Sequence, residues 1–134
     1  MRPIAGRLDL PDSGLKLTGL NAHMDEEQQR VCERYGADFT PPEETYKVGI
    51  SESAMRGEVP LHGLRHPPES GTTGWFIWSG EYSDADDFFK PVHLYHLIED
   101  CSAALPFLAL PPGWRFLVAP EYEDVWSDNS LLDT

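Results

Sequence analysis

Four histidines of this chain have the spacing of metal ligands. His62 and His66 are four residues apart, and His93 and His96 are three apart, with Glu99 following at the same interval. Residues at these intervals share one face of a helix, so His93, His96 and Glu99 could converge on a divalent cation. His62 and His66 lie in a segment rich in glycine and proline, where a helix is not expected. A metal-dependent enzyme is therefore one alternative, and histidines at the edge of a core are the simpler one.

Carboxylates are concentrated in two short acidic segments. They are Asp84, Asp86 and Asp87 in the first and Glu121, Glu123 and Asp124 in the second. Two such groups could act as a general acid and a general base, provided that a cleft held them at a fixed separation. Acidic loops are usually solvated, and the chain contains neither a Gly-x-Ser-x-Gly motif nor a G-x-x-x-x-G-K phosphate loop. The residues therefore favour a protein that is not an enzyme and needs no cofactor or metal.

Large aromatic side chains accompany these carboxylates. Residues 75–134 contain 11 Asp and Glu against only Lys90 and Arg115, and all four tryptophans of the chain fall in the same half. Tyr122 and Trp126 are set among acids, and protein interfaces favour Tyr and Trp anchors rimmed by charge. We therefore predict a partner-binding surface. Its residues are Asp84, Asp86, Asp87, Glu121, Tyr122, Glu123, Asp124 and Trp126.

The net charge indicates which partners such a surface would attract. The chain has a formal charge of −13 and a pI near 4.5. This field repels nucleic-acid phosphates and anionic membranes, whereas it attracts a cationic protein. No apolar run reaches the roughly 18 residues that span a bilayer, and the first residues lack the apolar stretch of a secretion signal. We expect a cytoplasmic protein that binds neither nucleic acid nor membrane. Self-association as a homodimer and a role as a general protein-interaction domain are left open.

Length and pattern indicate one domain. A chain of 134 residues has the commonest size of a single domain. Residues 1–23 contain scattered glycines and leucines without a persistent period, and are interpreted as a partly ordered N-terminal arm. Residues 24–134 are expected to form the domain. Cys32 and Cys101 lack the spacing of a zinc or redox motif and are expected to be buried thiols.

Helical patterns occur in three places. Residues 24–35 have acids near their start, and Gly36 is placed to end the helix. Residues 92–101 carry apolar side chains at intervals of three and four, which predicts a helix with one apolar stripe. Residues 103–110 stay apolar but contain Pro106, so a second short helix or a kink is expected there.

Strand patterns alternate with these helices. Residues 46–51 alternate between apolar and polar, and residues 74–78 form a continuous aromatic run that predicts the central strand. Residues 114–119 predict another strand, followed by a turn over 120–124 and a shorter strand at Val125–Trp126. This order predicts an α+β fold, a single domain with a mainly antiparallel sheet and two or three helices packed on it.

Several short motifs resemble those of a known protein family. Among them are Pro111-Pro112-Gly113-Trp114-Arg115-Phe116 and Tyr122-Glu123-Asp124-Val125-Trp126. The others lie at Gly63–Pro68, Gly74–Glu81 and Pro106–Leu108. In this order they resemble the immunity protein 33-like family, small bacterial proteins associated with polymorphic toxin loci, and the likeness covers roughly residues 27–132.

The resemblance implies an α+β cytoplasmic protein that protects its own cell by binding a protein toxin. It brings no motif-defined active site that could be assigned to residues of this chain. The negative charge of the aromatic-rich half is consistent with this expectation, because such a surface would attract a toxin with a basic surface.

Overall fold

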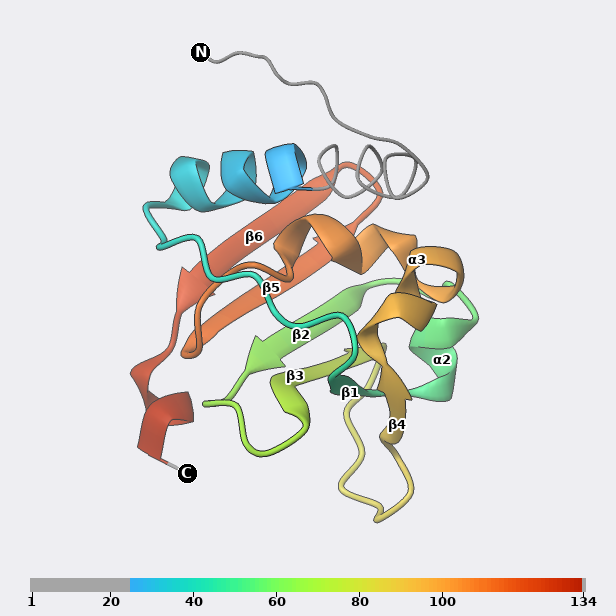
Figure 1. The fold of residues 1–134 in the computed structure, drawn as a ribbon. Helices are drawn as coiled ribbons and strands as arrows, with labels where there is room; N and C mark the ends of the chain where they lie inside the picture. Colours follow the sequence, from blue (N-terminus) through green and yellow to red (C-terminus); the bar gives the residue numbers. More distant parts are fainter. Residues whose placement is uncertain (1–24, 134) are drawn as a thin grey trace, which may run out of the picture.

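A six-stranded sheet organises residues 25–133, the part of the chain that the computed structural model describes (Figure 1). The strand order is β4-β1-β3-β2-β5-β6. Neighbouring strands are antiparallel except β1 and β3, which are parallel. The strands are β1 Lys47–Ile50, β2 Leu61–Arg65, β3 Thr72–Ser79, β4 Lys90–His93, β5 Trp114–Ala119 and β6 Tyr122–Ser127. The predicted α+β fold is confirmed, whereas the arm predicted at 1–23 lies outside the described residues.

Short helical segments connect the strands. They are a helix over 25–35, α2 Glu52–Met55, η1 Leu94–His96, α3 Leu97–Asp100, η2 Ser102–Phe107 and η3 Asn129–Asp133. The η segments are 3-10 helices, which occur mostly as short pieces. The first helix confirms the prediction for this region, and Gly36 follows it with a φ of 74°. Figure 1 shows this helix and the α3–η2 stretch on the same side of the sheet.

The helix predicted over residues 92–101 is wrong at its start. Its first two residues belong to β4, which pairs with β1, and helical turns begin only at Leu94. Leu94, Leu97 and Cys101 are buried as their spacing predicted, whereas Ile98 is 39% exposed. The apolar period therefore identified the buried face but not the first residue of the helix, because pairing with β1 keeps Val92 and His93 extended.

The core fills the space between the sheet and these helices. Trp75 in β3 and Phe116 in β5 are both 1% exposed, and the Trp75 indole Nε1 donates a hydrogen bond to the carbonyl of Leu108 at 2.9 Å. Cys32 and Cys101 are buried and free, as predicted. The aromatic run predicted as the central strand forms β3, an interior strand flanked by β1 and β2. The aromatic run thus lies in the middle of the sheet.

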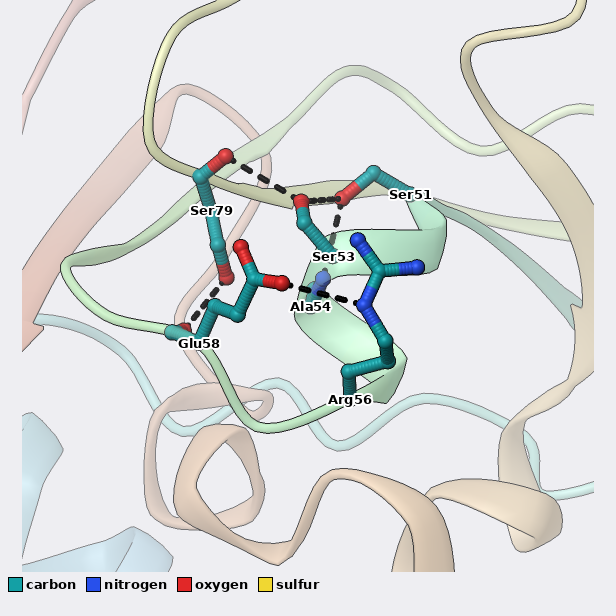
Figure 2. A network of polar contacts seen from close by, with 6 residues as sticks. All are labelled: Ser51, Ser53, Ala54, Arg56, Glu58 and Ser79. Carbon is teal, nitrogen blue, oxygen red and sulfur yellow. Dashed lines mark hydrogen bonds and ion pairs between the residues drawn. The ribbon is translucent and has the colours of Figure 1, made fainter.

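A serine network attaches α2 to the end of β3 (Figure 2). Ser51 caps α2 by accepting a hydrogen bond from the Ala54 amide, and its hydroxyl lies 2.9 Å from that of Ser53. The Ser53 hydroxyl donates to the carbonyl of Ser79, and the Ser79 hydroxyl donates to the carbonyl of Glu58. These hydroxyls therefore hold a one-turn helix whose few residues gave no periodic signal in the sequence.

A buried arginine joins four parts of the chain. Arg65 in β2 is 3% exposed and donates hydrogen bonds to the carbonyls of Thr40, Thr73 and Leu110. Its guanidinium also lies over the ring of Trp75 at 5.7 Å. Burial lowers the pKa of Arg65 to about 10, so the group still carries its charge at neutral pH. Three main-chain dipoles and an aromatic face thus take the place of a carboxylate partner.

One glycine lets the sheet and the helical layer approach closely. A methyl group on Gly63 would clash with the ring of Phe116, which lies across β2. The same ring stacks on Phe107 of η2, with centroids 4.9 Å apart and planes at 23°. Because Gly63 has no side chain, β2, β5 and η2 meet around a single aromatic ring.

Candidate partner-binding surface

The β5–β6 hairpin carries five of the eight residues predicted to bind a partner. Ala119 pairs with Tyr122, so Pro120 and Glu121 alone form the turn. The turn predicted over 120–124 is therefore too long, and β6 begins at Tyr122. Glu121 has a φ of 63°, in the left-handed region that favours glycine. The acidic run resembles a solvated turn in the sequence. It nevertheless forms part of β6, because exposed carboxylates do not interrupt an antiparallel strand.

Alternation along β6 sends these side chains to opposite faces of the sheet. Val125 is buried opposite Phe116, and Glu123 lies on the same face two residues earlier. Tyr122, Asp124 and Trp126 consequently point to the other face. The five residues of the hairpin therefore do not form one continuous patch.

Glu123 makes contacts within the chain. Its carboxylate oxygen Oε2 accepts hydrogen bonds from Arg34 Nη1 at 2.6 Å and from the Tyr35 hydroxyl at 2.7 Å. The hydrogen bond with Glu123 raises the pKa of Arg34, while burial and then the same carboxylate raise the pKa of Tyr35. Glu123 thus attaches the helix 25–35 to β6, through contacts between residues far apart in the chain that no local sequence pattern predicts.

Trp126 and Tyr122 are exposed at 36% and 53%, the property their prediction as anchors required. The guanidinium of Arg115 lies 5.6 Å from the centre of the Trp126 ring, and Arg115 Nη1 is 3.1 Å from Asp128 Oδ2. Hydrogen bonds from Ser130 and then from Arg115 hold the pKa of Asp128 below its usual value. One of the two cations in the second half of the chain is therefore already paired.

The acidic segment with Asp84, Asp86 and Asp87 lies in the connection from β3 to β4. All three carboxylates are exposed, and their side chains have no hydrogen bond or ion pair within residues 25–133. Since β4 and β6 are opposite edges of the sheet, this loop and the hairpin lie on different sides of the molecule (Figure 1). The structure therefore does not bring the two predicted acidic segments together.

The loop that carries these acids also covers aromatic rings on the sheet face opposite the helices. Phe89 packs edge-on against Phe76 at 5.1 Å, and Tyr82 packs against Trp78 at 5.4 Å. His62 stacks on Trp78, with ring centroids 4.9 Å apart. Burial and then the charge of Arg115 lower the pKa of His62. Rings that the strand pattern sent to this face are thus covered by a segment of the same chain.

The histidines do not form the metal-binding face that the alternative of a metal-dependent enzyme required. His93 ends β4 and His96 lies in η1, and the ring of Tyr95 stacks against His93 at 5.3 Å. His66 Nδ1 lies 3.1 Å from the carbonyl of Leu131. Within residues 25–133, no three His, Cys, Asp or Glu side chains are grouped so that they could hold a metal ion. His93, His96 and Glu99 lack a common helix, which their spacing argument required.

A cleft of about 880 Å³ lies where the helix 25–35, η2 and the β5–β6 turn meet. Its walls include three residues of the predicted surface, Glu121, Tyr122 and Glu123. Four further carboxylates line it, of which the sequence singled out only one, Glu99, and that as a candidate metal ligand. They are Glu27, Glu58, Glu99 and Asp100. No local sequence signal could have found these four together, because they come from three separate segments that only the fold assembles.

Comparison with protein families agrees with the resemblance drawn from the short motifs. The model of the Imm33-like domain matches residues 27–128, most of the chain. The chain belongs to the Imm33-like family. Comparisons with curated proteins and with solved structures gave no match. The predicted extent of the resemblance, to residue 132, is close to the matched range.

Two of the motifs of this Imm33-like protein make structural hydrogen bonds. The Gly113 amide of the Pro-Pro-Gly motif donates a hydrogen bond to the Arg65 carbonyl at 2.8 Å. Gly74 has a φ of 90°, and its carbonyl accepts a hydrogen bond from the His66 amide. These motifs therefore join the ends of β2, β3 and β5.

Within the described part of the chain, every helix is too short or too polar to cross a lipid bilayer.

Proposed function

We propose that this Imm33-like protein is a non-enzymatic bacterial immunity protein that binds a cognate protein toxin and neutralises it. The family match over residues 27–128 carries the proposal. The formal charge of −13 supports a toxin with a basic surface, because opposite charges steer the two proteins together and speed their association. The same charge disfavours nucleic acid and anionic membranes as partners. We place the protein in the cytoplasm, where a toxin would act on its own cell.

The eight acidic and aromatic residues of the predicted surface are the proposed contacts. A standard interface covers about a tenth of the surface of a small protein, so one toxin need not touch both acidic segments. The hairpin is the better half, because Tyr122 and Trp126 are exposed there beside unpaired carboxylates. The loop with Asp84, Asp86 and Asp87 offers charge together with Tyr82, which is 60% exposed.

Co-expression tests the function directly. The toxin domain encoded in a neighbouring reading frame is expressed in a bacterial host with and without this protein. We expect growth arrest with the toxin alone, survival with both, and co-purification of the pair. Continued arrest with every neighbouring toxin domain, despite abundant folded protein, would refute the proposal.

Charge reversal then locates the surface. Glu121→Lys with Asp124→Lys should slow association with the toxin at least about tenfold, with a smaller effect on dissociation. Glu123 is left intact because it holds Arg34 and Tyr35. The matched control is Glu43→Lys with Glu69→Lys, two exposed acids outside the predicted surface. An equal loss of association rate in both variants would attribute the effect to net charge and remove the hairpin from the interface.

A further inference from the structure

We propose that the cleft between the helix 25–35, η2 and the β5–β6 turn receives a segment of the toxin that carries lysine or arginine side chains. This inference rests on the proposed function and adds the place and the chemistry of the contact. Three features of the cleft carry it: an excess of carboxylates, an apolar floor, and exposed side chains at its edge.

The carboxylates of the cleft outnumber its cations. Six carboxylates and two guanidinium groups line it. Arg34 is already held by Glu123 at 2.6 Å, and Arg30 lies 3.8 Å from Glu26. Among the six, Glu58 is paired with Arg56 at 3.0 Å. The remaining four have no side-chain hydrogen bond or ion pair within residues 25–133. They are Glu27, Glu99, Asp100 and Glu121.

The floor of the cleft is apolar. Val31, Leu61 and Phe107 line it, and each is at most 5% exposed. Lysine and arginine lay their methylene stems along apolar surface while the charged group reaches for an acceptor. An apolar floor below a rim of carboxylates matches both parts of such a side chain. A metal ion would use only the carboxylates and leave the apolar floor uncovered, and a small anion would be repelled by the carboxylates.

The exposed residues at the edge favour a protein segment over a small cation. Val59 and Tyr122 both line the cleft and are 52% and 53% exposed. A polypeptide that enters the cleft can continue over these two side chains and bury them, whereas a small molecule would leave them in water. A second copy of the chain fits poorly, because it brings a charge of −13 to a negative cleft.

The test uses the full-length protein and a defined peptide. The probe is a six-residue peptide with blocked ends that alternates one leucine with two basic residues, Lys-Arg-Leu-Lys-Arg-Leu. Its control has Glu and Asp in place of the basic residues. Two-dimensional NMR of the labelled protein locates the binding site, and calorimetry measures the affinity at low and at high salt.

Neutralisation of the free rim carboxylates provides the decisive variant. Glu27→Gln, Glu99→Gln and Asp100→Asn remove three charges from the cleft. The matched variant Glu43→Gln, Glu69→Gln and Glu81→Gln removes three exposed charges that lie outside both the cleft and the predicted surface, so both proteins have the same net charge. Urea unfolding of both variants checks that the fold is retained.

We expect the basic peptide to shift the amide signals of Val31, Ala103 and Val118, residues that line the cleft. The cleft variant should bind the peptide about tenfold more weakly, the scale of three partly exposed ion pairs, whereas the matched variant should change by less than about twofold. Equal weakening in both variants, shifts confined to another face, or binding of the acidic control as tight as that of the basic peptide would overturn the inference.

The same variants separate this inference from the proposed function. If the unmodified protein protects cells from a neighbouring toxin and the cleft variant protects and binds that toxin equally well, the function stands and the cleft is not its contact. If the peptide occupies the cleft but no neighbouring toxin is neutralised, the acidic cleft stands as a site for basic segments and the immunity function fails.

Discussion

The carboxylates of the β5–β6 hairpin differ in how freely they can meet a partner. Glu123 accepts hydrogen bonds from Arg34 and Tyr35, whereas Glu121 and Asp124 have no side-chain partner within residues 25–133. A partner cation can therefore pair with Glu121 or Asp124 without breaking an internal contact. Substitution of Glu123 would change the attachment of a helix as well as binding, so it is the least informative of the three to mutate.

His62 makes the stability of the protein depend on pH. Because burial and the charge of Arg115 lower its pKa below the ordinary 6.5, the unfolded state binds a proton more readily than the folded state. Stability should therefore fall as the pH drops below about 6.5 and continue to fall until the lowered pKa of the folded state is passed. Urea unfolding at several values between about pH 7.5 and about pH 5 measures this slope.

Replacement of the imidazole isolates its share of the slope. In His62→Gln the free energy of unfolding should fall less steeply on acidification. In His96→Gln, a change at an exposed position of η1, it should fall as steeply as in the unmodified protein. The lowered pKa of Asp128 does not interfere, since its window lies below 3.8. The same slope in the His62→Gln protein as in the unmodified one would contradict the assignment.

At the scale of elements, Arg65 is the residue on which the most segments depend. Its guanidinium donates to carbonyls before β1, in β3 and after η2, and it does so while 3% exposed. Arg65→Met should lower the free energy of unfolding by about 3 kcal/mol, because it leaves buried carbonyls without donors. Denaturant unfolding of both proteins measures the change, provided that the dependence of the unfolding free energy on denaturant concentration is the same in both.

The control for this substitution is another arginine to methionine change. Arg56 is exposed and paired with Glu58 at the surface, so Arg56→Met should cost less than about 0.5 kcal/mol. A similar small cost at Arg65 would mean that removal of a buried charge compensates for the lost hydrogen bonds.

Periodicity in the sequence predicted some elements well and others not at all. The helix over 25–35 and the aromatic strand β3 repeat their patterns over several residues, which is enough to fix type and position. α2 has four residues, too few to show a period, and is held by the serine network. β4 could not be told from the start of a helix, because its extended backbone follows from pairing with β1, a contact distant in sequence.

Part of the candidate site could likewise be predicted from the sequence, and part of it could not. Tyr122, Trp126 and the acids around them could be found because they are neighbours in sequence. Glu27, Glu58 and Asp100 could not, since only the packing of the helix 25–35 and η2 against the sheet brings them to one cleft. The sequence also could not show that the loop at Asp84 and the hairpin lie at opposite edges, because that follows from strand order.

For the whole molecule, a single core predicts how the two thiols behave. Cys32 and Cys101 are 2% and 6% exposed, and burial raises the pKa of both. Thiol reagents attack the thiolate, so both cysteines should react slowly in the native protein and fully in denaturant. Their two native rates should be equal if both report global unfolding.

Mass spectrometry after timed exposure to a thiol reagent resolves the two sites. One cysteine that reacts much faster than the other in native buffer would contradict a single cooperative core. It would also identify which helical segment opens first, the helix 25–35 for Cys32 or the α3–η2 junction for Cys101.

The two outermost strands of the described sheet each carry a feature that opposes strand pairing between copies of the protein. β4 contains a proline, which lacks an amide donor, and β6 contains Glu123 and Asp124 between two further flanking acids. Two copies aligned along β6 would set these carboxylates against each other. Lateral growth of the sheet from copy to copy is thereby opposed at both edges, which disfavours aggregation through pairing of edge strands.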